Sequence, residues 1–347
     1  MKLSQFNFDL PPHLVAQYPA EERDEARLMV ADRELGTIEH YSFKDLPKFF
    51  KEGDALVLNN SKVFPCYLRG YKEKTMANIG VLLLRELDST HHLWDVWIDP
   101  ARKIRVGNKL CFNQDLVAEV IDNTTSRGRT IKFSFDGDSD TLRKIFNEIG
   151  EPPMPSALNR KAEEMDRERY KTIYAKEPGS VAPPTAGFHF TPYLLKYLEV
   201  EGVLLPEVTL HISVDSFKRV EAEELRKYKL HTEFYHIPKE TETIVNNALE
   251  QERKVCAVGT STLKALETSL SHTRSLQAGK GWSNKFVNPP YETEIANALI
   301  TNFHLPRSID FVNTLAFAGH NFAMEIYAAA IAEKYRFFVY GDALLIL

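Results

Sequence analysis

The alternation of apolar and polar residues predicts several short strands in the first half of the chain. Residues 55–60, ALVLNN, form an apolar run that ends in two turn-forming asparagines, as expected of a buried strand. Residues 93–99, LWDVWID, and 129–135, RTIKFSF, alternate apolar with polar positions, which predicts half-buried strands. Turn-forming clusters separate these segments at short intervals. This spacing favours a small β-barrel or sandwich between residues 65 and 135.

A helical period replaces the alternation further along the chain. Leu142, Ile145, Phe146 and Ile149 share one face of a helix expected over 140–150. We also expect helices at 191–202, 241–253 and 321–335, a strand, polar turn and helix over 254–270, and a closing pair of strands over 336–347.

Mixed helices and strands around a strand-rich middle segment indicate an α/β fold. The simplest architecture is a large α/β domain built from both chain ends, residues 1–64 and 150–347. A small β-barrel domain, residues 65–149, is then inserted between them.

Composition adds limits to this picture. The chain has 347 residues, of which 44% are hydrophobic and 26% charged, as in soluble globular proteins of about two domains. No apolar run approaches the roughly 20 residues of a membrane span, and the first residues do not resemble a signal peptide. Three widely spaced cysteines favour a reducing compartment.

The formal net charge of −5 does not indicate a nucleic-acid binder, but a binding surface depends on local charge rather than on the total. Basic clusters that are either solvated faces or parts of such a surface occur at 101–109, 159–161, 167–171 and 225–229.

One loop is unusual in composition. Residues 177–191, EPGSVAPPTAGFHFT, carry a single formal charge, at Glu177. Pro183 and Pro184 prevent a continuous helix because they fix φ and lack N–H donors. The segment is therefore expected to be a rigid loop that presents His189 to a cleft.

A second candidate site is the turn before the helix expected after residue 259. Gly259, Thr260, Ser261 and Thr262 would expose backbone donors and hydroxyls to a carboxylate, a phosphate or a ribose, and Lys264 would add charge. The segment lacks the pattern of a phosphate-binding P-loop. An ordinary helix cap explains it equally well.

His189, His211 and His304 lie between apolar neighbours, and His231 follows Leu230. This setting predicts a shared pocket formed by the four histidines. Glu233, two residues after His231, would share a strand face with it. Asn59 and Asn60 are either turn formers or uncharged readers of a base edge. A zinc site is the alternative for the histidines, although the usual ligand spacings are missing.

Several motifs, in order along nearly the whole chain, resemble the S-adenosylmethionine:tRNA ribosyltransferase-isomerase family of queuosine biosynthesis. They are QYPAEERDEARLMV (17–30), LVLNNSKVFPCYLRG (56–70), DRERYKTIYAKEPGSVAPPTAGFHFT (166–191), VGTSTLKALE (258–267), ALITNFHLP (298–306) and YRFFVYGDALLIL (335–347).

The resemblance implies a monomeric cytoplasmic enzyme with an α/β barrel-like large domain and an inserted small β-barrel. It implies that S-adenosylmethionine donates a ribosyl group to 7-aminomethyl-7-deazaguanine in tRNA, giving epoxyqueuosine-tRNA, adenine and methionine. No metal, redox cofactor or membrane is expected.

The same resemblance, together with the chemistry, suggests roles for the candidate residues. Proton carriers are expected among His189, His211, His231 and Glu233. Substrate-binding residues are expected among Asn59, Asn60, Thr185, Gly187, Gly259, Thr260, Ser261, Lys264, Asn302 and His304, with Thr260, Ser261 and Lys264 on the methionine carboxylate.

The chain departs from the family pattern at several of these motifs. Residues 213–217, SVDSF, replace a glycine-rich turn, and Lys264 replaces an arginine. Asn284, Asn288 and Pro290 replace Asp, Tyr and Gly. The alternative function is therefore that of a divergent paralogue that binds a nucleoside or RNA without this catalysis.

Overall fold

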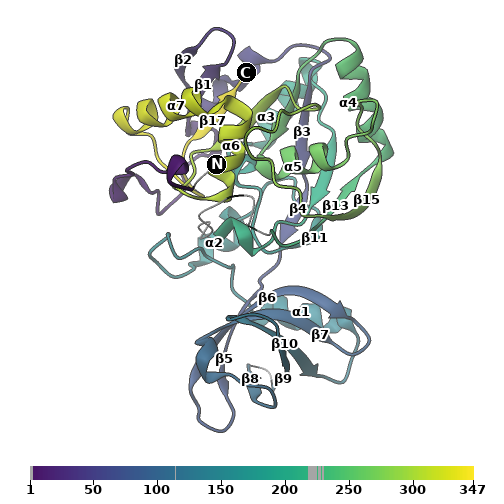
Figure 1. Cartoon of the computed structure of the whole chain (residues 1–347). Coiled ribbons are helices and arrows are strands. Elements are labelled where there is room, and N and C mark those ends of the chain that lie inside the picture. Colours follow the sequence, from purple (N-terminus) through teal and green to yellow (C-terminus); the bar gives the residue numbers. More distant parts are fainter. Residues whose placement is uncertain (1–2, 114, 218–224, 226–227, 229) are drawn as a thin grey trace. The chain divides into compact units, whose positions relative to one another are not determined.

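A computed structural model describes the chain except for residues 1–2, 114, 218–224, 226–227 and 229 (Figure 1). The chain forms two compact units. The large unit comprises Met1–Lys62, Ser156–Arg160 and Arg169–Leu347, and the small unit comprises Val63–Pro155 and Lys161–Glu168. The sequence placed the inserted domain at residues 65–149.

A nine-stranded mixed sheet forms the centre of the large unit. Its strands, in spatial order, are β15 (Gly279–Ser283), β13 (Glu233–Ile237), β12 (Glu207–Leu210), β3 (Ala55–Asn59), β14 (Val255–Val258), β16 (Ala298–Asn302), β17 (Ala343–Ile346), β1 (Arg27–Asp32) and β2 (Thr37–Ser42). The central four, β12, β3, β14 and β16, are parallel to one another. Their residues are almost all buried, which matches the continuous apolar runs of the sequence.

Helices cover this sheet, and successive strand residues point to opposite faces. Val57 packs in one buried cluster with residues of α5 (Thr260–Thr268), α6 (Ile309–Ala318) and α7 (His320–Ala332). Leu56 and Leu58 pack in the other, with residues of α3 (Pro192–Val200). Helix α4 (Lys239–Glu250) contributes Val245 to the first cluster.

Short 3-10 helices of the large unit are η1 (Leu3–Phe6), η2 (Pro12–Leu14), η3 (Arg23–Glu25), η4 (Phe43–Phe49), η6 (Thr185–His189) and η7 (Val214–Phe217).

The small unit contains a closed six-stranded barrel. Its strands are β10 (Gly128–Ser134), β7 (Leu93–Asp99), β6 (Asn78–Asp88), β5 (Tyr67–Lys72), β8 (Lys109–Phe112) and β9 (Val117–Asn123). Helix α1 (Ser139–Ile149) packs on the barrel through Phe146, whose ring centroid lies 5.4 Å from that of Trp94. The unit also contains η5 (Ala101–Lys103) and most of α2 (Glu164–Arg169). The expected α/β fold with an inserted small β-barrel is confirmed.

The prediction of one element is wrong. In place of a closing strand pair over 336–347, the chain forms only β17, and Phe337 makes a single bridge to Val15. Phe338 has φ +77°, which interrupts an extended strand at this point. Two further short strands, β4 (Ser61–Val63) and β11 (Glu177–Ser180), pair with each other.

No helix in the described part of the chain is long and apolar enough to cross a membrane.

Candidate active site

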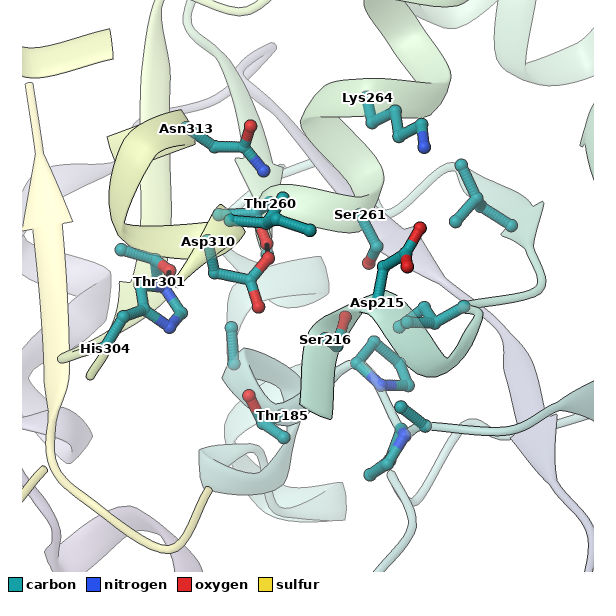
Figure 2. Close-up of a pocket in the computed structure, with 18 of the residues that line it drawn as sticks. Thr185, Asp215, Ser216, Thr260, Ser261, Lys264, Thr301, His304, Asp310 and Asn313 are labelled. Atoms are coloured by element: carbon teal, nitrogen blue, oxygen red, sulfur yellow. Dashed lines mark hydrogen bonds between the residues drawn. The ribbon is translucent and has the colours of Figure 1, made fainter. Parts of the chain in front are cut away.

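The main pocket of the large unit lies at the ends of the parallel strands β12, β14 and β16, and such strand ends are where open α/β sheets bind their ligands. The space between its walls, open solvent at the mouth included, is about 860 Å³. Figure 2 shows many of its lining side chains. The polar and charged ones are Tyr170, Thr185, Asp215, Ser216, Glu233, Thr260, Ser261, Lys264, Lys285, Thr301, His304, Asp310 and Asn313.

Helix α5 begins at this pocket. Gly259 has φ +94°, a conformation that favours glycine, and it turns the chain from β14 into the helix. The first helical hydrogen bond runs from the Leu263 N–H to the Gly259 carbonyl, 3.1 Å. No described residue accepts from the N–H groups of Thr260 and Ser261, so the helix presents free donors and the positive end of its dipole.

Lys264 and Glu233 form a buried ion pair inside the pocket wall. Lys264 Nζ donates to Glu233 Oε2 at 2.6 Å, and the side chains are 9% and 7% exposed. Glu233 Oε1 accepts from the Ser213 N–H at 2.7 Å. The two residues expected to act separately, Glu233 on protons and Lys264 on a carboxylate, are therefore bound to each other.

The turn at residues 213–217, which differs from the family pattern, lies beside this pair. Its residues form η7, and Asp215 and Ser216 line the pocket. Asp215 Oδ1 lies 2.8 Å from His231 Nδ1, and Asp215 Oδ2 accepts from the His231 N–H at 2.6 Å. The Asp215 side chain of this turn thus makes specific contacts with His231, two residues before β13.

The histidines do not share one pocket, so that expectation is wrong. His304 lines the main pocket, where its Nε2 shares a hydrogen bond with Thr301 Oγ1 at 2.7 Å, and burial lowers its pKa. The ring of His211 stacks on Phe234, with centroids 5.6 Å apart, and does not line the pocket. Burial lowers the pKa of His211 to about 4.

His189 does not line the main pocket, but it is connected to the pocket through Asn302 and Thr185. It lines a smaller cavity with Arg23 and Arg336, and burial lowers its pKa to about 4. Asn302 Nδ2 lies 3.5 Å from His189 Nε2, and Asn302 Oδ1 accepts from Thr185 Oγ1 at 3.0 Å. The rigid loop therefore presents Thr185 to the pocket, with His189 behind it.

Gly187 makes room for a neighbouring side chain rather than for a ligand. A Cβ at this position would collide with the Tyr174 hydroxyl and would lie 2.6 Å from the Thr172 methyl carbon. Gly187 does not line the main pocket. Its small size accommodates Tyr174.

Asn59 and Asn60 connect strands within the protein. Asn59 Nδ2 donates to the Leu210 carbonyl and to Ser261 Oγ, both at 3.1 Å. Asn60 Nδ2 donates to Glu207 Oε2 at 3.0 Å, and its Oδ1 accepts from Thr209. Neither asparagine lines the main pocket.

Sequence reasoning missed two polar residues of α6. Asp310 Oδ1 accepts from Thr260 Oγ1 at 2.8 Å, and Asn313 is 6% exposed. Both line the main pocket and lie three residues apart, on one face of the helix. An isolated acidic residue in the first turn of a helix is normally explained by its favourable interaction with the helix dipole. The position of Asp310 in the sequence therefore did not indicate a functional site.

Other expectations concern metals and charge. Among the described residues, no group of three or more His, Cys, Asp or Glu side chains is arranged to hold a metal ion. None of the altered positions Asn284, Asn288 and Pro290 lines the main pocket. Most of the basic cluster at 225–229 lies outside the described residues.

Comparisons with known proteins cover both units. A family model described as "Queuosine biosynthesis protein" matches residues 3–346. Proteins named S-adenosylmethionine:tRNA ribosyltransferase-isomerase from Amoebophilus asiaticus and Flavobacterium psychrophilum are each 54% identical to this chain, over 348 and 349 residues and the full length of both partners. A crystal structure of an S-adenosylmethionine tRNA ribosyltransferase from Thermotoga maritima is 33% identical, covers 99% of this chain and all of its own, and has a TM-score of 0.56.

Proposed function

The chain belongs to the queuosine biosynthesis family of S-adenosylmethionine:tRNA ribosyltransferase-isomerases, and we propose that the main pocket of its large unit is the site of that reaction. The enzyme transfers and isomerises the ribosyl moiety of S-adenosylmethionine onto 7-aminomethyl-7-deazaguanine in tRNA. The products are epoxyqueuosine-tRNA, adenine and methionine. Identity of 54% along the full length of a named relative carries this conclusion. No observation favours the non-catalytic paralogue.

The pocket suits this donor chemically. Its walls combine apolar side chains, among them Ile212, with hydroxyls, an amide and charged groups. A molecule that carries an adenine, a ribose and an amino acid needs all three kinds of surface. The free N–H groups of Thr260 and Ser261 are placed to receive its carboxylate.

The reaction needs several proton transfers. The acceptor amine must be neutral to attack, C5′ next to the sulfonium must lose a proton, and adenine departs more easily when a ring nitrogen is protonated. We assign a proton-carrying role to His231. His231 does not itself line the pocket, but Asp215, which does, contacts its Nδ1. In this proposal the other ring nitrogen of His231 meets the substrate beside the pocket.

The remaining candidates act indirectly in this proposal. The Glu233–Lys264 pair holds the turn at Ser213, and His189 positions Thr185 through Asn302. His304 and Thr301 form part of the pocket wall.

The reaction requires no metal or redox cofactor in this proposal, since the sulfonium is itself the activated leaving group. We also propose that the enzyme acts as a monomer in the cytoplasm, where its tRNA substrate is found. S-adenosylmethionine serves as a co-substrate.

An adenine-release assay tests the function. The protein is incubated with S-adenosylmethionine and tRNA that carries 7-aminomethyl-7-deazaguanine, and adenine, methionine and the modified nucleoside are quantified. We expect all three in equal amounts, none with unmodified tRNA, and no loss of activity after exhaustive chelation. Binding of tRNA without adenine release would establish the non-catalytic alternative instead.

A further inference from the structure

Asp310 is an unusual charge in the main pocket. Of the other charged side chains there, Glu233 and Lys264 neutralise each other, and Asp215 contacts His231. Lys285 Nζ donates to the Glu267 carbonyl at 2.6 Å. Among the described residues, the Asp310 carboxylate accepts only from the neutral hydroxyl of Thr260 and has no cationic partner.

A carboxylate at the mouth of a polar pocket is stabilised when a cation binds beside it. Figure 2 shows the Asp310 carboxylate pointing into the space between His304, Thr185 and Ser216. The site is therefore prepared for a positively charged group of a ligand.

Asn313 supplies an independent sign of a ligand. Its side chain is more than nine-tenths buried and lines the pocket, yet it makes no hydrogen bond with any described residue. Buried amides are normally hydrogen-bonded, so the partner of this one comes from the contents of the pocket, and a bound molecule can supply it. An amide both donates and accepts, and it can therefore contact an anion and a cation together.

The start of α5 lies directly against Asp310. Thr260, the first residue of α5, donates its hydroxyl to Asp310 Oδ1 at 2.8 Å. A single hydrogen bond thus joins the start of α5, which can bind an anion, to the Asp310 carboxylate, which lacks a cationic partner among the described residues. An α-amino acid has the complementary arrangement, with a carboxylate and an ammonium on one carbon.

We propose that Asp310 binds the α-ammonium group of S-adenosylmethionine, while the N-terminus of α5 binds its α-carboxylate and Asn313 contacts both. This assignment rests on the proposed function of the pocket. It places the amino-acid end of the donor between α5 and α6. Asp310 is then a specificity residue for the amino acid and takes no part in proton transfer.

The test compares ligands that lack one charged group. KM for S-adenosylmethionine, and Ki for its analogue without the α-amino group, are measured with saturating precursor tRNA on wild type and Asp310→Asn. We expect the variant to raise KM about 10- to 100-fold with kcat nearly unchanged, because a hydrogen bond between charged groups is lost. Ki for the deaminated analogue should be the same for both proteins.

A matched control is Asp24→Asn. Asp24 Oδ2 accepts from Thr191 Oγ1 at 3.1 Å, the same kind of contact, but outside the main pocket. This variant should behave like wild type.

Two results would overturn the assignment. One is an equal loss of affinity for both ligands in Asp310→Asn, which would indicate ribose recognition. The other is a lower kcat with unchanged KM. If Asp310→Asn does not fold, the two ligands are compared on the wild type alone. A deaminated analogue that binds to the wild type as tightly as S-adenosylmethionine refutes the proposal. If the wild type releases no adenine, the proposed function fails, and equilibrium dialysis of the two ligands still tests the Asp310 contact.

Discussion

Lys264 Nζ lies 2.6 Å from Glu233 Oε2, and both side chains are more than nine-tenths buried. These residues come from α5 and β13, and the pair fixes the wall of the main pocket through the further bond from Glu233 to the Ser213 N–H. Its main effect is therefore on stability and on the shape of the turn.

Removing one member of this pair should be costly. We expect Lys264→Met or Glu233→Gln to lower the free energy of unfolding of the large unit by about 3–5 kcal/mol, since each leaves a buried polar group without its partner. The double variant should be closer to wild type than either single variant. Calorimetric unfolding of the four proteins measures this.

The matched control for this pair is Lys196→Met. Lys196 pairs with Glu199, but the side chains are 73% and 51% exposed, so we expect a change below about 1 kcal/mol. A Lys264→Met variant as stable as Lys196→Met would show that the buried pair contributes nothing.

His189 should make stability depend on pH. Burial lowers its pKa from 6.5 to about 4. Above pH 6.5 both the folded and the unfolded protein hold a neutral ring, and the stability is fully present. Between pH 6.5 and 4 only the unfolded protein gains the proton, so stability falls, by about 3 kcal/mol in total for this residue.

Urea unfolding at a series of pH values measures the effect. His189→Gln should lose less stability than wild type between pH 6.5 and 4, because glutamine does not titrate. His211→Gln should change in the same direction, since burial lowers the pKa of His211 to about 4 as well. Identical pH slopes in His189→Gln and wild type would contradict the prediction.

Gly187 should be intolerant of a side chain because of Tyr174. A Cβ at Gly187 would collide with the Tyr174 hydroxyl, so we expect Gly187→Ala to destabilise the large unit by about 1–3 kcal/mol. Tyr174→Phe should cost little alone, because its buried hydroxyl has no hydrogen-bond partner among the described residues.

Thermal unfolding of the two variants and their combination tests the contact. Tyr174→Phe should recover part of the stability lost in Gly187→Ala. A double variant whose loss equals the sum of the single losses would show that the hydroxyl is not the obstacle.

The sequence predicted local structure better than it predicted contacts. The alternation over 93–99 and the apolar face at 140–150 correspond to β7 and α1, because both signals depend only on neighbours in the chain. The turn before α5 was also predicted, since Gly259 and the hydroxyl residues act locally.

The partners of the polar residues were not predictable in this way. Glu233 and Lys264 are 31 positions apart, and His189 and Asn302 are 113 apart. Their pairing depends on which strands become neighbours. Apolar neighbours suggested that the histidines face one pocket, but burial in separate parts of the core gives a histidine the same kind of neighbours. Asp310 was missed because an acid in a first helical turn has an ordinary structural explanation.

The contact between His231 and Asp215 yields a prediction about catalysis. We expect His231→Ala to lower kcat about 10²- to 10⁴-fold, the usual contribution of a general acid or base, with little change in KM for S-adenosylmethionine. Asp215→Asn should lower kcat less, because the asparagine can still hydrogen-bond to His231. His91→Ala is the matched control, since His91 Nδ1 lies 2.7 Å from Asp88 in the small unit. Adenine release measured from pH 5 to 9 separates the cases: a His231→Ala enzyme with the kcat and pH profile of His91→Ala would exclude His231 as the proton carrier.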